Sequence, residues 1–169
     1  LSFYLPPAGG RPGRRPQDRR RTLDAIFWVA CSKLPWKDLP ERFGRPDSAS
    51  RTLRRWARSG HLDALLAQVA DEAPRNPLWR ALAWRICRAW RRVSRIVTLS
   101  QLLMAKRLNL RAALPAAPCH LPDPDLSKTV QAMVVAALKR VREQPRGTFR
   151  LLGKLLMRAG GNRRHWRTR

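Results

Sequence analysis

Acidic residues are scarce in this sequence. The 169 residues include 36 Lys and Arg against 11 Asp and Glu, which gives a formal net charge of +25. After Glu72 the imbalance grows, with 22 basic and 3 acidic residues against 14 and 8 before it. A field of this sign attracts polyanions such as nucleic acids. The shortage of carboxylates also argues against acid–base or two-metal catalysis.

Cysteine and histidine are few and scattered. Cys31, Cys87 and Cys119 are odd in number, far apart and without CxxC spacing, which excludes a disulfide framework and a zinc site of known spacing. The three histidines have no potential catalytic partner near them in the sequence, and a glycine-rich phosphate loop is missing. We therefore expect no enzyme activity, no metal and no cofactor.

Long hydrophobic runs and strand-like alternation are also missing. The apolar run over residues 133–138, like every other apolar run in the sequence, is far shorter than the roughly 20 residues that a spanning helix needs, and the chain does not open with a signal-peptide core. The hydrophobic content of 44% nevertheless suffices for a core. The expected class is an all-α cytoplasmic protein, nucleoid-associated if it binds DNA.

Helical periodicity, prolines and glycines divide the chain. We expect an all-α fold in which a helix-turn-helix of three to four helices follows an extended basic arm and precedes an Arg-rich helical region. The predicted segments are an extended basic arm (1–21), a helix-turn-helix domain (22–72), a long amphipathic basic helix region (75–112), a Pro-rich linker (113–126), a C-terminal helical hairpin (127–161) and a basic tail (162–169).

The helix-turn-helix prediction depends on the spacing of apolar and turn residues. A first helix is expected over residues 20–32, and a short helical segment over residues 36–43 carries Pro40. Gly44, Pro46 and Asp47 supply a turn, after which Ser48 is the expected N-cap of a third helix that ends at Gly60. A fourth helix follows. Helix, turn and helix at this spacing are typical of DNA-binding proteins.

The third helix is the first candidate for DNA recognition. If Leu53, Trp56 and Ala57 face inward, the opposite side combines phosphate-positioning groups with arginines able to pair with guanine. The candidate residues on that side are Ser48, Ser50, Arg51, Arg54, Arg55 and Arg58. The alternative interpretation is a merely solvated basic helix.

The arm is the second candidate. Arg11, Arg14 and Arg15 lie on a backbone that proline and glycine keep thin, a composition that resembles an AT-hook and suits the minor groove. The alternative is a flexible, solvated segment.

The tryptophans are expected to be mainly core residues. Trp36 and Trp56 occupy apolar helical positions, and Trp84 falls between cationic residues off the apolar stripe of its predicted helix. That stripe, a candidate homodimer surface, consists of Trp79, Leu82, Ile86 and Trp90.

The amino-terminal part of the sequence resembles the N-terminal domain of bacterial transposases of the insertion sequence five type. The matching residues are Leu5-Pro6-Pro7, Gly10-Arg11-Pro12, Asp18, Arg19, the helix over 23–29, the run 35–44, Arg54-Arg55-Trp56 and Gly60. The run 35–44, Pro-Trp-Lys-Asp-Leu-Pro-Glu-Arg-Phe-Gly, is the most specific of these. Lys33 stands where the family usually has glycine.

This resemblance implies a helix-turn-helix that binds the terminal inverted repeats of an insertion element. In the family a DDE nuclease domain with an RNase H-like fold follows. After Pro77 this sequence offers neither the strands nor the spaced Asp, Asp and Glu of such a domain. The expected function is therefore non-catalytic binding of duplex DNA by a transposase-derived protein.

Other interpretations stay open at this point. The chain could be a truncated transposase relic or a degenerate reading frame, since GC-rich frames yield much Arg, Ala and Pro. Its basic amphipathic second half could instead bind a membrane or RNA. An active transposase is the enzyme alternative.

Overall fold

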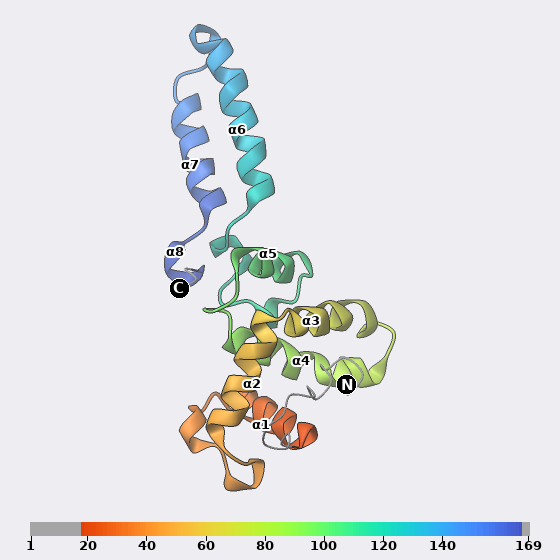
Figure 1. The fold of residues 1–169 in the computed structure, drawn as a ribbon. Coiled ribbons are helices and arrows are strands. Elements are labelled where there is room, and N and C mark those ends of the chain that lie inside the picture. Colours follow the sequence, from red (N-terminus) through yellow and green to blue (C-terminus); the bar gives the residue numbers. More distant parts are fainter. Residues whose placement is uncertain (1–17, 167–169) are drawn as a thin grey trace. The chain divides into compact units, whose positions relative to one another are not determined.

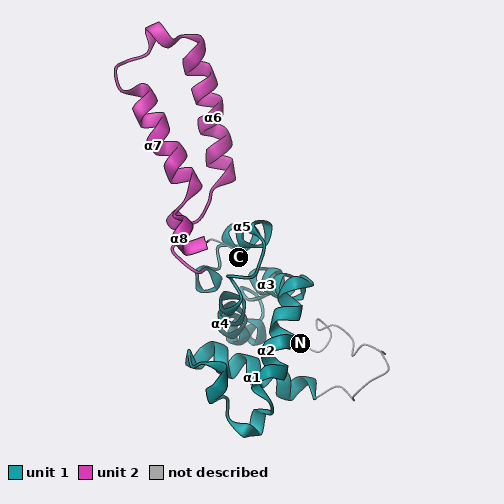
Figure 2. Ribbon diagram, turned by 60° about the vertical axis from the view of Figure 1, so that its left-hand side comes forward, with its two compact units in different colours: residues 1–114, 168–169 teal, residues 115–167 magenta. Residues whose placement is uncertain are grey.

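Helices account for nearly all the regular structure of residues 18–166, the part of the chain that the computed structural model describes (Figure 1). No strand occurs between these two positions, so the all-α prediction is confirmed. The chain forms two units that divide between Leu114 and Pro115 (Figure 2). No helix in the described part is long and apolar enough to cross a membrane.

The first unit contains five α-helices and three short 3₁₀ helices in its described part. In chain order they are α1 (Arg19–Ser32), η2 (Trp36–Asp38), η3 (Glu41–Phe43), α2 (Pro46–Arg58), α3 (His61–Glu72), α4 (Pro77–Arg92), α5 (Leu99–Arg107) and η4 (Arg111–Ala113). Helix α4 packs against α1, α3 and η4, and α2 packs against α1, η2 and α3. Leu66, Val69, Ile86 and Trp90 are fully buried in this core.

The first unit therefore extends well beyond the predicted helix-turn-helix domain of 22–72. The prolines at positions 74 and 77 end α3 and begin α4 without separating two units, because Asn76 caps α4 and Pro77 occupies its first turn. Since α4 packs against α1 and α3, the helices on both sides of this turn share one core. The boundary predicted between residues 72 and 75 is thus corrected to Leu114.

The segment predicted as one short helix over 36–43 is two 3₁₀ turns. Leu39, between them, is extended with φ −64° and ψ 122°. The ring of Pro40 disfavours helical backbone in the preceding residue, and Pro40 lacks the N–H that would continue a helix. Residues 36–43 therefore do not form the α-helix that is expected before the turn of a helix-turn-helix.

The region predicted as one long helix over 75–112 is also divided. Helix α4 ends at Arg92, a turn follows, and α5 begins after Thr98. The Thr98 hydroxyl accepts from the backbone N–H of Gln101, and the Gln101 side chain accepts from the Thr98 N–H. This capping box starts a new helix, and Val93 and Val97 are buried in the turn before it.

The second unit is a helical hairpin. Its elements are η5 (Pro118–His120), α6 (Pro124–Lys139), η6 (Val141–Glu143), α7 (Thr148–Gly160) and α8 (Arg163–Trp166). Helix α6 begins earlier than the predicted 127, because Asp123 caps it by accepting from the Leu126 N–H and Pro124 occupies the first turn. The predicted linker 113–126 and tail 162–169 therefore contain short helices within the described range.

The core of the hairpin is small. Val130, Ala137 and Leu152 are buried where α6 and α7 pack together. Met133, Val135, Leu138, Phe149, Leu151 and Met157 are large apolar side chains that stay exposed. These six apolar side chains thus lie outside the small core of the hairpin.

One carboxylate ties four helices of the first unit together. Asp63 at the start of α3 accepts from the indole Nε1–H of Trp90 at 2.8 Å and from the Gln101 amide. The same amide donates to the carbonyl oxygen of Ala57 in α2 at 2.9 Å. Trp90 is fully buried, so its N–H depends on this carboxylate for a partner.

Replacing Asp63 with alanine should lower the free energy of unfolding by about 1–3 kcal/mol, because the Trp90 N–H would stay buried without an acceptor. Urea unfolding followed by circular dichroism measures the change. Asp71→Ala is the control: its carboxylate pairs with Arg75 on the surface, and its loss should matter by less than about 0.5 kcal/mol. Equal stabilities of the two variants would contradict this role of Asp63.

Lys33 occupies a backbone conformation that favours glycine. It follows the last residue of α1 with φ 63° and ψ 2°, in the left-handed region. Lys33→Gly should therefore stabilise the protein by about 0.5–1 kcal/mol. This net value is the backbone strain that glycine relieves, minus the free energy that glycine costs by making the unfolded chain more flexible. Lys33→Ala retains the strain and should bring no such gain. A thermal melt in which the alanine variant gains as much as the glycine variant would disprove the backbone explanation.

Candidate nucleic-acid interface

Helix α2 carries four arginines on its exposed surface. Its inward face is fixed by Leu53, Trp56 and Ala57, which are 1–5% exposed. Trp56 is therefore a core residue, as predicted. The four exposed arginines lie between and beyond these anchors at helical spacing: Arg51, Arg54, Arg55 and Arg58.

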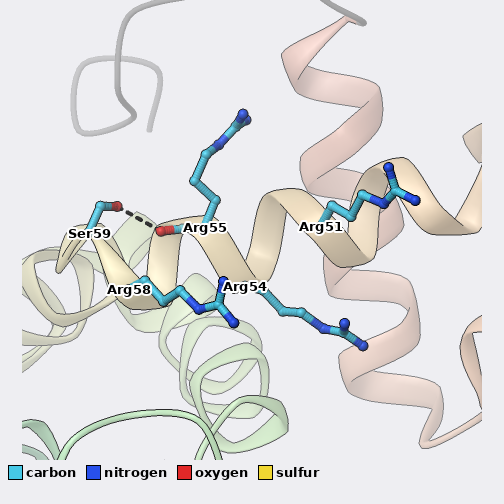
Figure 3. Close-up of a pocket in the computed structure, with 5 residues that line it drawn as sticks. All are labelled: Arg51, Arg54, Arg55, Arg58 and Ser59. Atoms are coloured by element: carbon cyan, nitrogen blue, oxygen red, sulfur yellow. Dashed lines mark hydrogen bonds between the residues drawn. The ribbon is translucent and has the colours of Figure 1, made fainter.

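These arginines line an open hollow of about 560 Å³ together with Ser59. In Figure 3, Arg54 and Arg58 extend to one side of the helix, whereas Arg55 extends to the other. The Ser59 hydroxyl donates to the Arg55 carbonyl at 2.9 Å and closes the last turn of α2. The hollow thus presents guanidinium groups over a wide arc.

No side chain of the described residues pairs with the arginines that line the hollow. Within residues 18–166, Arg51, Arg54, Arg55 and Arg58 form no ion pair and no side-chain hydrogen bond. Like charges three and four residues apart on a helix repel one another. An anion that binds several of these guanidinium groups relieves that repulsion and accepts charge-assisted hydrogen bonds.

Neither of the two predicted serines is fully exposed. Ser48 lies inside the first turn of α2 and is half-buried, because the helix begins at Pro46 and Arg45 is its N-cap. Ser50 is only 8% exposed, since it is three residues before Leu53 and shares the inward side of the helix. The prediction that Ser48 caps this helix is therefore wrong, whereas the predicted contacts of both serines with DNA stay predictions. Arg11, Arg14 and Arg15 of the predicted arm lie outside the described residues.

A second hollow, which we call the groove, lies beside the first. The groove has a volume of about 310 Å³ and combines half-buried Trp36 with arginines from α2 and from the end of α4. Trp36 was predicted as a core residue, but it lines this surface groove. Arg92 and Arg95 were not predicted as site residues, because a continuous helix over 75–112 did not place them near α2.

The apolar stripe predicted as a homodimer surface is used inside the first unit. Ile86 is 1% exposed and Trp90 is fully buried, because α4 is covered by α1 and α3. Ile86 and Trp90 are therefore not available to a second copy, whereas Trp79 and Leu82 of the same stripe are half-buried and the homodimer stays a prediction. Trp84, predicted to lie off the stripe, is 53% exposed, with the Arg88 guanidinium 5.9 Å from its ring centre.

The cysteines do not form a reactive or metal-binding group in the described part of the chain. Cys31, Cys87 and Cys119 are free thiols. Burial raises the pKa of Cys87 to about 11 and also raises that of Cys31, against the opposing effect of Arg85 and Arg88. Both thiols are thus poor nucleophiles near neutral pH. Within the same range, no three His, Cys, Asp or Glu side chains gather in a metal-binding arrangement.

Comparison with known proteins finds a family similarity for the amino-terminal part of the chain. Residues 1–66 match the model of the family described as "Putative transposase of IS4/5 family". The protein described as "Uncharacterized protein y4sN" from Sinorhizobium fredii (strain NBRC 101917 / NGR234) is 45% identical over 67 residues, which are 38% of this chain and 54% of that protein. The chain thus matches about half the length of this relative.

No solved structure matches the chain. The matched segment contains α1, η2, η3, the whole of α2 and the start of α3, so the arginine face of α2 lies inside it. The resemblance seen in the sequence motifs is therefore confirmed over this segment. Residues 1–66 are thus similar to the family described as "Putative transposase of IS4/5 family".

Proposed function

We propose that the protein binds duplex DNA through the arginine face of α2 and that its residues 1–169 do not catalyse DNA cleavage. The observation that carries this proposal is the row of four exposed, unpaired arginines on a helix that belongs to the transposase-related segment. An α-helix fits the major groove, and guanidinium groups pair bidentately with guanine or bind phosphates. The terminal inverted repeats of an insertion element are the proposed targets.

The charge distribution supports an anionic partner. The net charge of +25 attracts a polyanion at long range, and the arginines of α2 supply the short-range contacts. The arm residues Arg11, Arg14 and Arg15 would add minor-groove contacts beside the helix. For catalysis, DNA cleavage by two metals needs a cluster of carboxylates, and the described residues contain no cluster of three potential metal ligands.

The proposal is tested first by selection. Purified protein is mixed with a pool of random duplex DNA at several salt concentrations, and the retained DNA is sequenced. The proposal expects an enriched motif that survives at higher salt. Retention without a motif, lost steeply with salt, would show a nonspecific polycation and overturn sequence recognition by α2. Products cut from the selected DNA in the presence of Mg²⁺ would overturn the non-catalytic part.

Single arginine variants then locate the interface. Each of Arg51→Ala, Arg54→Ala, Arg55→Ala and Arg58→Ala should weaken binding to the selected DNA, by about 1–3 kcal/mol where the arginine pairs with a base. Fluorescence anisotropy with labelled duplex measures the change.

The matched control is Arg75→Ala, which removes the same charge from a surface ion pair between Asp71 of α3 and the turn that follows this helix. Because long-range attraction falls equally in all five variants, a base contact shows itself as the excess loss over this control. Binding that falls by the same factor in the control and in every α2 variant would count against an interface on α2.

A further inference from the structure

The groove beside the arginine face combines an aromatic wall with a cationic rim. Trp36 of η2 lines the groove together with apolar side chains from α2 and from the turn after α4. These apolar residues are Leu53, Val93 and Ile96. The volume of about 310 Å³ is at the lower end of the range typical of small-ligand sites.

Arginines from two distant parts of the sequence line the same groove. Arg54 and Arg58 come from α2, whereas Arg92 and Arg95 come from the end of α4 and the turn that follows. Arg92 also donates to the carbonyl oxygen of Leu34 at 2.7 Å. This bond fastens the backbone just before Trp36 to the end of α4 and holds the two sides of the groove together.

The groove is continuous with the proposed DNA surface. Arg54 and Arg58 line both the hollow on α2 and the groove beside it. A strand that contacts the α2 arginines therefore passes directly by the opening of the groove. This adjacency means that one ligand can occupy both sites.

The side chains that line the groove determine which part of a DNA strand fits into it. Phosphates need only the arginines and make no use of an indole ring or of buried aliphatic walls. A nucleobase stacks on an aromatic ring, but a base inside a duplex is already covered on both faces by its neighbours. A mixed aromatic and cationic groove of this size therefore matches a single nucleotide that is not paired.

We propose that this groove binds one unpaired DNA nucleotide, with its base stacked on Trp36 and its phosphate held by Arg92 and Arg95. The nucleotide extends from the duplex that lies on α2, so the inference rests on the proposed function. It adds a preference for DNA with an unpaired base at an end or within the duplex.

The test compares four forms of the DNA selected above: a blunt duplex, one with a single-nucleotide overhang, one whose overhang is an abasic sugar phosphate, and one with a single unpaired base inside the duplex. The overhang should raise the affinity about 5- to 100-fold over blunt DNA, the value of stacking one base. The abasic overhang should recover little of this gain. A duplex with one internal unpaired base shows whether an end is required. Equal affinities for the blunt, overhanging and internally unpaired DNAs would overturn the proposal.

Variants of the aromatic wall give the sharper test. Trp36→Ala should abolish the gain from the overhang and leave binding of blunt duplex unchanged, whereas Trp36→Phe keeps an aromatic face and should retain most of it. The control is Trp84→Ala, which removes an exposed tryptophan outside the groove. Thermal melts confirm that each variant is folded. If Trp36→Ala lowers blunt and overhang binding equally, or if Trp36→Phe loses the gain completely, stacking on Trp36 is disproved.

The salt dependence tests the cationic rim. For the overhanging DNA, Arg95→Ala should reduce the slope of log K against log salt by about 0.7–0.9, the value of one phosphate contact. For blunt DNA its slope should not change. If no duplex binds at any salt, the proposed function fails; the groove is then tested alone with a labelled thymidine oligonucleotide, whose binding must still depend on Trp36.

Discussion

The carboxylate of Asp63 is the interaction on which the architecture of the first unit depends. It accepts from the buried indole of Trp90 and from Gln101, whose amide also reaches the Ala57 carbonyl. Asp63 belongs to the segment matched by the transposase family, and its two donors lie outside that segment. The helices of the family-matched segment therefore pack together with α4 and α5, and residues 67–114 are part of the same compact unit.

This constraint also determines how α2 can carry so much positive charge. Four unpaired arginines within two turns disfavour a helix, because like charges repel at these spacings. The helix is held instead by the burial of Leu53 and Trp56 and by the bond from Gln101 at its last turn. Burial of each large apolar side chain contributes about 1.5–3 kcal/mol, which exceeds the repulsion of a few tenths for each exposed pair. The core thus keeps the arginines in place without neutralising them.

Local sequence signals predicted the α-helical class, the position of α1 and the arginine face of α2, because helical periodicity and caps depend only on neighbouring residues. Two errors could have been avoided from the same kind of signal. Thr98 and Gln101 form a capping-box pattern that marks the start of α5, and Ser50 shares the helical face of Leu53. The exposure of Trp36 and its proximity to Arg92 could not be predicted, because they depend on how α4 packs against α1 and how η2 packs against α2.

The shared arginines make the proposed duplex surface and the groove one energetic unit. Arg54 and Arg58 face both, so a phosphate bound on one side reduces the repulsion that the other arginines experience. Residues that share partners in this way do not contribute additively to binding. The binding free energy lost when Arg54 is removed must then depend on whether a nucleotide occupies the groove. Arg51 lines the hollow but not the groove, so the binding free energy lost when it is removed depends much less on the nucleotide. Coupling of this kind would join recognition of the duplex by α2 to the presence of an unpaired base beside it.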